Sequence, residues 1–151
     1  MRRNIRCQGA IIRNDHILLI KHREKKDGRE YWAIPGGGRE KDETEEECVI
    51  REMKEETNLD VTVKKLLLDL KGNPEDYYQR LKTYLCLPKK GEAHPGCEPE
   101  FDIDEGYAIV EVAWFDLRDE TTWDKLVIAN PFTYPTLQKI QVALGYIGNN
   151  I

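Results

Sequence analysis

The sequence contains no hydrophobic run of the length that a membrane span requires. Its mean hydropathy is −0.65 and 34% of its residues are charged, whereas a transmembrane helix needs about 20 consecutive apolar residues. The N-terminal stretch MRRNIRCQGAIIRND also lacks the uninterrupted apolar core of a secretory signal peptide. We therefore expect a cytoplasmic protein with no membrane partner.

Cysteine and histidine are scarce and are not grouped. The residues concerned are Cys7, Cys48, Cys86, Cys97, His16, His22 and His94. They lack the short paired spacings of structural zinc sites and of disulfide frameworks. We therefore expect free thiols in a reducing compartment and no structural zinc.

An excess of positive charge is also missing, since the formal net charge is −5. Nucleic-acid-binding domains are usually basic, so we expect no nucleic-acid partner. One local basic cluster precedes a glycine-rich turn, and its members are Lys21, His22, Arg23, Lys25, Lys26 and Arg29. A solvated loop and a contact with phosphate explain this cluster equally well, and Arg23 is our candidate from it for substrate binding.

What the sequence does have is a concentration of glutamate behind a Pro-Gly-Gly-Gly turn, in the stretch WAIPGGGREKDETEEECVIREMKEETNL at residues 32–59. Glu52, Glu55 and Glu56 fall within two turns of a predicted helix, where like charges repel each other. A divalent cation relieves that repulsion, and Mg²⁺ typically takes one or two carboxylates together with waters and substrate phosphates. The stretch therefore predicts metal-assisted chemistry on a phosphate compound.

This stretch resembles the Nudix box, the pattern G-x5-E-x7-R-E-U-x-E-E-x-G-U in which U is a bulky aliphatic residue. The matching residues are Gly37, Glu43, Arg51, Glu52, Met53, Glu55, Glu56 and Leu59. Asn58 stands where the pattern has glycine. That position follows the helix and calls for the left-handed backbone conformation, which asparagine tolerates best after glycine. We therefore expect the box to work despite this departure.

The resemblance implies a metal-dependent hydrolase that uses Mg²⁺ or Mn²⁺, since both ions accept the same oxygen ligands. The implied ligands are the carboxylates of Glu52, Glu55 and Glu56 and the backbone carbonyl of Gly36. Glu52 is alternatively the general base, while Glu43 and Arg51 would orient the ligands. A bound ion lowers the pKa of a nucleophilic water and neutralises phosphate oxygens.

The general base and the substrate contacts are less sharply indicated. A second source for the base is the set of acidic residues before and within the last strand, which are Glu98, Glu100, Asp102, Asp104, Glu105 and Glu111. We choose Glu105, although each of them singly fits a solvated acidic position better. Besides Arg23, the candidate substrate-binding residues are Gly36, Gly37, Gly38, Arg39 and Tyr77. Trp32 and Trp114 are more typical of a core than of base stacking.

By this resemblance the substrate is a nucleoside diphosphate linked to another moiety X, such as a nucleoside triphosphate, ADP-ribose, a nucleotide sugar or a dinucleoside polyphosphate. The alternative is a Nudix-fold sensor that binds a nucleotide without cleaving it. Such sensors usually lose box glutamates, whereas this sequence keeps them all. A homodimer is also possible, because many members of the family are dimers.

The remaining pattern predicts one α/β domain over residues 1–151, a Nudix-type α/β/α sandwich around a mixed β-sheet. Strands are expected at 5–13, 16–22, 31–34, 61–70, 80–87 and 107–117, and a helix at 135–144 that ends at Gly145. Thr44 and Glu47 form a capping box, so a helix is expected to begin after Thr44. Cys48, Val49 and Met53 form its predicted buried stripe, with the three glutamates mostly outside it.

Overall fold

The computed structural model describes residues 5–72, 78–97 and 106–146. The strands are β1 (Ile5–Arg13), β2 (His16–Glu24), β3 (Glu30–Ala33), β4 (Gly36–Gly38), β5 (Val61–Lys71), β6 (Arg80–Pro88) and β7 (Tyr107–Asp116). The helices are α1 (Glu45–Thr57), α2 (Lys125–Ile128), α3 (Thr133–Leu144) and the 3-10 turn η1 (Glu120–Thr122). None of the helices in these ranges is long and apolar enough to cross a membrane.

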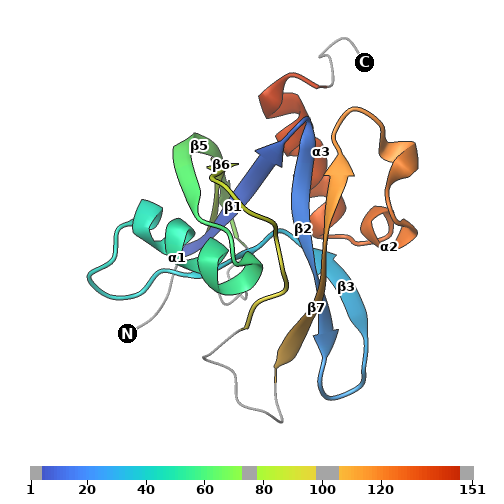
Figure 1. Cartoon of the computed structure of the whole chain (residues 1–151), viewed down its shortest axis with the longest axis horizontal. Helices are drawn as coiled ribbons and strands as arrows, with labels where there is room; N and C mark the ends of the chain where they lie inside the picture. Colours follow the sequence, from blue (N-terminus) through green and yellow to red (C-terminus); the bar gives the residue numbers. More distant parts are fainter. Residues whose placement is uncertain (1–4, 73–77, 98–105, 147–151) are drawn as a thin grey trace.

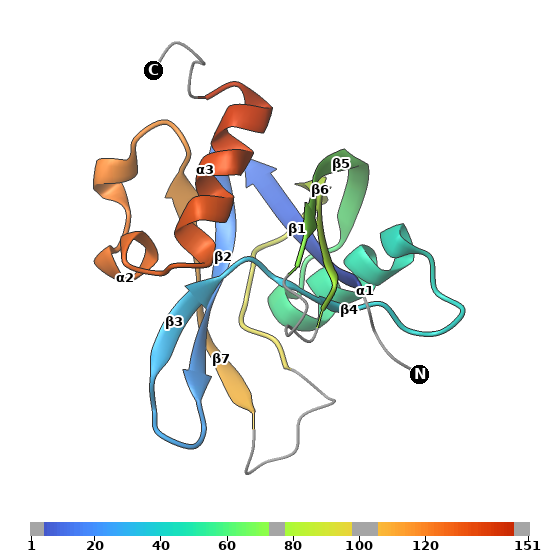
Figure 2. The ribbon, with the colours of Figure 1, turned by 180° about the vertical axis from the view of Figure 1, so that it is seen from behind.

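The strands form one mixed sheet, in the order β3-β2-β1-β6-β5, with β4 paired to β1 and β7 paired to β2. β1 runs parallel to β6, whereas the other pairings are antiparallel. The turn between β1 and β2 is made by Asn14 and Asp15, which both have positive φ. β1 thus lies at the centre of the sheet and carries β4, the glycine-rich segment, alongside its first residues (Figure 2).

Helices cover both faces of the sheet, so the predicted sandwich is confirmed. Ile17 and Leu19 of β2 pack in one buried cluster with α3, while Leu18 between them packs in a second cluster with α1. This alternation is the period of two that a strand imposes on its side chains. Figures 1 and 2 show α1 on one side of the sheet and α3 on the other.

Helix α1 begins and ends as its sequence predicts. The side chain of Thr44 accepts a hydrogen bond from the backbone N–H of Glu47, and the Glu47 side chain accepts one from the N–H of Thr44. At the other end Asn58 adopts the left-handed conformation with φ 64°. Its side-chain amide donates to the carbonyls of His94 and Pro95. Asparagine therefore supplies a tether that the glycine of the pattern would lack.

Several predicted boundaries are corrected by the structure. Strand β2 continues through Glu24, so the loop before β3 is shorter than the predicted 23–30. The glycine-rich turn is itself a short strand, β4. Helix α3 begins at Thr133 because the Asn130 side chain accepts hydrogen bonds from the N–H groups of Phe132 and Thr133. The Asn130-Pro131 pair is a helix-start signal that sequence reasoning missed.

Candidate active site

Two of the three clustered glutamates are buried, which corrects the expectation that they lie off the buried stripe of α1. Glu52 is 1% exposed and Glu56 is fully buried. Residues four apart share a helix face, so both belong to a row that begins at Cys48. A parallel row, Val49 and Met53, faces the apolar core. The helix is thus buried along two rows, and the row with the carboxylates faces β4.

The glycines of β4 lie directly against these carboxylates. The backbone N–H of Gly36 donates to Glu56 Oε1 at 2.8 Å. A Cβ atom at Gly37 would lie 2.3 Å from Glu52 Oε2. Gly37 has no positive φ, so the glycine is required there for space and not for backbone conformation. The sequence pattern therefore brings the backbone of the glycine strand into contact with both buried carboxylates.

Arg51 connects the remaining carboxylates of the site. Its Nε donates to Glu43 Oε2 at 2.7 Å and its Nη2 to Glu43 Oε1 at 3.1 Å, while Nη1 reaches Glu52 at 3.1 Å and Glu55 at 3.2 Å. Nη2 also donates to the carbonyl of Gly38. The predicted orienting contact with Glu55 is present, and Glu43 is an additional, bidentate partner.

Arg51 also sets the protonation state of Glu43. Burial by itself raises the pKa of Glu43, but the hydrogen bonds and positive charge of Arg51 outweigh it and hold that pKa below its usual range. The Glu43 carboxylate in turn raises the pKa of Arg51. The pair is therefore fully ionised, and it fixes the position from which Arg51 reaches Glu52 and Glu55.

The oxygen donors of the site fit a divalent cation. The carboxyl groups of Glu43, Glu52 and Glu55 meet at the guanidinium of Arg51, and that of Glu56 lies at the backbone of Gly36. Buried carboxylates are costly unless they are paired or bind a metal. Within the described ranges, no three side chains of His, Cys, Asp or Glu are grouped closely enough to form a complete metal site by themselves. Mg²⁺ needs only one or two carboxylates, with water and phosphate completing its octahedron, so the residues present fit this ion.

The segment at 94–97, which precedes the acidic residues at 98–105 in the sequence, lies against the C-terminal end of α1. The N–H groups of His94, Gly96 and Cys97 donate to the last carbonyls of α1, those of Thr57, Glu56 and Glu55 respectively. A Cβ atom at Gly96 would lie within 2 Å of the Glu55 carbonyl oxygen. Only glycine permits this approach, which brings residues 94–97 against the end of α1. Glu105, our candidate base, lies outside the described residues.

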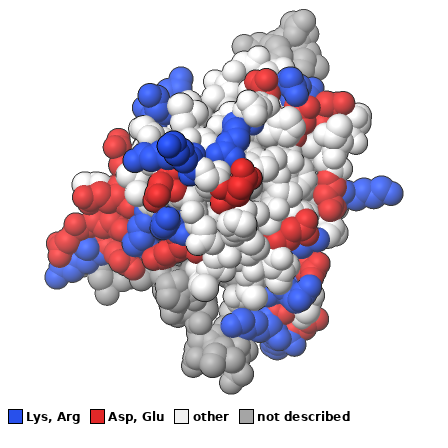
Figure 3. Space-filling model, in the orientation of Figure 1, with Lys and Arg blue, Asp and Glu red and all other residues white. Residues whose placement is uncertain are grey.

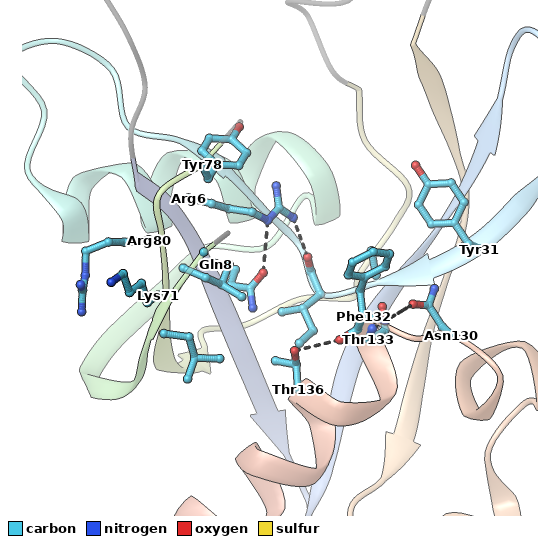
Figure 4. A pocket seen from close by; sticks show the side chains of 15 residues that line it. Arg6, Gln8, Tyr31, Lys71, Tyr78, Arg80, Asn130, Phe132, Thr133 and Thr136 are labelled. Carbon is cyan, nitrogen blue, oxygen red and sulfur yellow. Dashed lines mark hydrogen bonds between the residues drawn. The ribbon is translucent and has the colours of Figure 1, made fainter. Parts of the chain in front are cut away.

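A cavity of about 480 Å³ has Arg6 in its wall, and Arg6 donates a hydrogen bond to the carbonyl of Gly36. It is lined by Arg6, Gln8, Tyr31, Ala33, Ile34, Leu70, Lys71, Gly72, Tyr78, Arg80, Leu81, Asn130, Phe132, Thr133 and Thr136. Figure 4 shows Lys71 and Arg80 on one side, Tyr31 and Asn130 on the other, and Arg6 between them. Tyr31, Phe132 and Asn130 thus lie toward one end of the cavity, and Lys71 and Arg80 lie at the other.

None of the predicted substrate-binding residues that the structure describes, which are Arg23, Gly36, Gly37, Gly38 and Arg39, lines this cavity. Arg23 lies near the end of β2 and pairs with Glu30 at 2.6 Å, while Arg39 is exposed and donates to the carbonyl of Glu43. Tyr77 lies outside the described residues, although its neighbour Tyr78 lines the cavity. Trp32 is 2% exposed and belongs to the core. Three members of the predicted basic cluster, Lys21, Arg23 and Arg29, thus form ion pairs with glutamates.

Arg6 is one of the residues of the site that sequence reasoning missed, together with Tyr31, Asn130 and Phe132. Its signal is a period-two pattern: Arg6 and Gln8 are polar at the start of a strand face that continues with the apolar Ala10 and Ile12. Gln8 is almost completely buried, and its amide donates to Thr83.

Charged residues also gather on the side of the molecule where α1 lies (Figure 3).

Comparison with known proteins places the chain in a family. Residues 3–136 match the NUDIX domain. The Bacillus subtilis protein YjhB is 34% identical over 96 residues, which are 60% of this chain and 44% of YjhB. A Methanocaldococcus jannaschii protein named ADP-ribose pyrophosphatase is 46% identical over 63 residues, 42% of this chain and 37% of that protein. The matches thus span less than half the length of these two relatives.

The fold of the whole chain is shared with solved structures. A NUDIX family hydrolase from Clostridium perfringens superposes with a TM-score of 0.68 at 19% identity, covering 98% of this chain and all of that one. The chain thus combines a NUDIX domain match over residues 3–136 with a mixed sheet, a buried glutamate row on α1 and a glycine strand against that row. The chain belongs to the Nudix family.

Proposed function

We propose that the protein is a Nudix pyrophosphohydrolase that cleaves a diphosphate linkage with a divalent cation, Mg²⁺ or Mn²⁺. The observation that carries the proposal is the burial of Glu52 and Glu56 against the backbone of Gly36 and Gly37, beside a cavity of about 480 Å³. Buried carboxylates are costly unless they are paired or bind a metal, and a bound divalent cation would add to the pairing that Arg51 gives Glu52.

Each residue of the site has a distinct proposed role. Glu52, Glu55 and Glu56 and the carbonyl of Gly36 would hold the ion, which supplies an activated water and neutralises the phosphate oxygens. Arg51 keeps Glu52 and Glu55 oriented, and Glu43 keeps Arg51 in place through two hydrogen bonds. For the general base we propose Glu52 or one of the acidic residues before and within the last strand, with Glu105 as the choice among the latter.

The cavity supports a nucleoside diphosphate linked to a moiety X as the substrate. Tyr31 and Phe132 line the cavity and bring aromatic rings within reach of a base. The M. jannaschii relative is named for ADP-ribose, which makes ADP-ribose the first compound to test. We also propose a single domain over residues 1–151 that acts in the cytoplasm on small nucleotides, and a homodimer as its candidate assembly.

A nucleotide sensor without catalysis remains the alternative function. It accounts for the cavity equally well, but it gives no reason to bury Glu52 and Glu56 in a row on α1 and to keep Glu55 in contact with Arg51. The hydrolase accounts for both features. The two functions also differ in their product, because a sensor leaves the nucleotide intact.

The test is phosphate release from a panel of nucleoside triphosphates, ADP-ribose, nucleotide sugars and dinucleoside polyphosphates. Each compound is incubated with Mg²⁺, with Mn²⁺ and with chelator, and coupling to phosphatase or pyrophosphatase separates the product types. Chelator-sensitive turnover of one class is expected. Binding of a panel member without turnover under any metal condition would favour the sensor.

A further inference from the structure

One arginine stands at the junction of the carboxylate cluster and the cavity. Arg6 donates from Nη1 to the carbonyl of Gly36 at 3.1 Å and from Nη2 to the carbonyl of Ile34 at 3.0 Å. Its Nε donates to the side chain of Gln8 at 3.2 Å, and Gln8 in turn donates to Thr83. The guanidinium is therefore held in one position, on the wall of the cavity (Figure 4).

The peptide of Gly36 joins this guanidinium to a buried carboxylate. Glu56 accepts a hydrogen bond from the N–H of Gly36, while Arg6 donates to the carbonyl of the same residue. Burial by itself lowers the pKa of Arg6, but the charge of Glu56, with smaller effects from other groups including Glu52, raises it above the ordinary value. The positive charge of Arg6 thus already interacts with the carboxylates of Glu56 and Glu52.

Arg6 also keeps hydrogen-bonding capacity toward the cavity. A guanidinium has five N–H groups, and the bonds of Arg6 to described residues use three of them. Since Nη1 and Nη2 each carry two hydrogens, one N–H on each terminal nitrogen is left. Each remaining N–H can donate a charge-assisted hydrogen bond to a phosphate oxygen of a ligand in the cavity that Arg6 lines.

We propose that Arg6 binds the diphosphate of the substrate from the cavity side and serves as the counter-charge of the glutamate row before the cation arrives. The inference rests on the proposed cation site. It predicts effects of opposite sign when the charge is removed: the cation binds more tightly to the substrate-free protein, and the diphosphate binds more weakly. A residue that only braces the glycine strand would weaken both when it is removed.

The experiment uses two probes, Mn²⁺ alone and ADP in the presence of Mn²⁺. Electron paramagnetic resonance of free Mn²⁺ gives the first affinity, and titration calorimetry gives the second. Arg6→Ala removes the charge, Arg6→Lys keeps it without the planar fork, and Arg13→Ala is the matched control. Arg13 lies on the same strand and also donates to backbone carbonyls, those of Lys89 and Gly91.

For Arg6→Ala we expect Mn²⁺ affinity to rise about fivefold, because one repulsive charge is lost. ADP affinity should fall about 100-fold, since charge-assisted hydrogen bonds are lost. Arg6→Lys should keep the Mn²⁺ affinity of the wild type and lose about tenfold for ADP, which keeps the test valid if Arg6→Ala does not fold. Arg13→Ala should change neither affinity.

Parallel loss of both affinities in Arg6→Ala, or unchanged ADP binding in Arg6→Lys, overturns the role of Arg6 while leaving the cation site intact. A wild-type protein that binds no Mn²⁺ overturns the cation site itself and this inference with it. The two failures are distinguishable because the first requires a wild type that binds both probes.

Discussion

Substitution of Gly37 by alanine tests whether the glycine strand is built around the Glu52 carboxylate. The added Cβ would lie 2.3 Å from Glu52 Oε2, 2.5 Å from its Cδ and 2.7 Å from its Oε1. Contacts below 3.0 Å force a shift, so the carboxylate must move by roughly 0.7 Å or more. Because Glu52 is 1% exposed and Arg51 holds its Oε2, the movement displaces a proposed metal ligand.

The displacement should cost far more activity than stability. A misplacement of about 1 Å in a catalytic group lowers turnover by about 100-fold. Overpacking costs about 1–3 kcal/mol of unfolding free energy, and each kcal/mol lowers the melting temperature by about 2–4 °C in a chain of this size. The assay is kcat at saturating cation on the best substrate of the panel, with the melting temperature measured by calorimetry.

A matched control and a second-site variant make this prediction specific. Gly28→Ala has nothing within 4 Å of the new Cβ but a φ of +76°, so it should lose about 1–2 kcal/mol of stability at unchanged kcat. Glu52→Asp shortens the side chain by one methylene and withdraws its carboxylate from Gly37. Adding Gly37→Ala to Glu52→Asp should therefore lower kcat little further. Full additivity of the two losses, or a Gly37→Ala protein with kcat within threefold of the wild type, would refute the reasoning.

Three further results are expected. The pKa of Glu43 is depressed in the folded protein, so the Glu43 carboxylate stabilises the fold above its unfolded pKa and stops doing so as the pH falls through its folded pKa. Urea unfolding from pH 6 to pH 3 should show this loss of stability. The loss should be smaller in Glu43→Gln. Thr44→Ala removes the cap of α1 and should cost about 1 kcal/mol, seen as a lower melting temperature. Phe132 is 81% exposed at the cavity, so Phe132→Ala should raise KM about tenfold by lost stacking and leave kcat and the melting temperature unchanged.

Helix α1 shows how far local sequence signals reach. The capping box at Thr44, the left-handed Asn58 and the pairing of Arg51 with Glu55 all depend on residues within a few positions of one another, and the structure confirms each of them. The burial of Glu52 and Glu56 could not be predicted in this way. It arises because β4 pairs with β1 and is thereby placed against the helix, and a row of carboxylates by itself is typical of a solvated face.

The cavity shows the same limit more strongly. Arg6 comes from the first strand and Asn130 from the segment before the last helix, and only the sheet order brings them to one cavity. The polar pair Arg6 and Gln8 on an otherwise apolar strand face was a usable signal. Arg23 belongs to a basic cluster in the sequence, but its charge is paired with Glu30, because neighbouring strands of a hairpin bring opposite charges together.

The central claim is that the buried glutamate row holds the cation required for cleavage, and Glu56→Gln tests it most directly. Glutamine keeps an oxygen that can accept the hydrogen bond from Gly36, so the fold should persist while the charge is lost. The measurement is chelator-sensitive turnover of the wild type, of Glu56→Gln and of Glu46→Gln, an exposed glutamate of the same helix. We expect a loss of about 1,000-fold or more in Glu56→Gln at an unchanged melting temperature, and wild-type turnover in Glu46→Gln. Turnover that survives Glu56→Gln or the chelator would contradict the account.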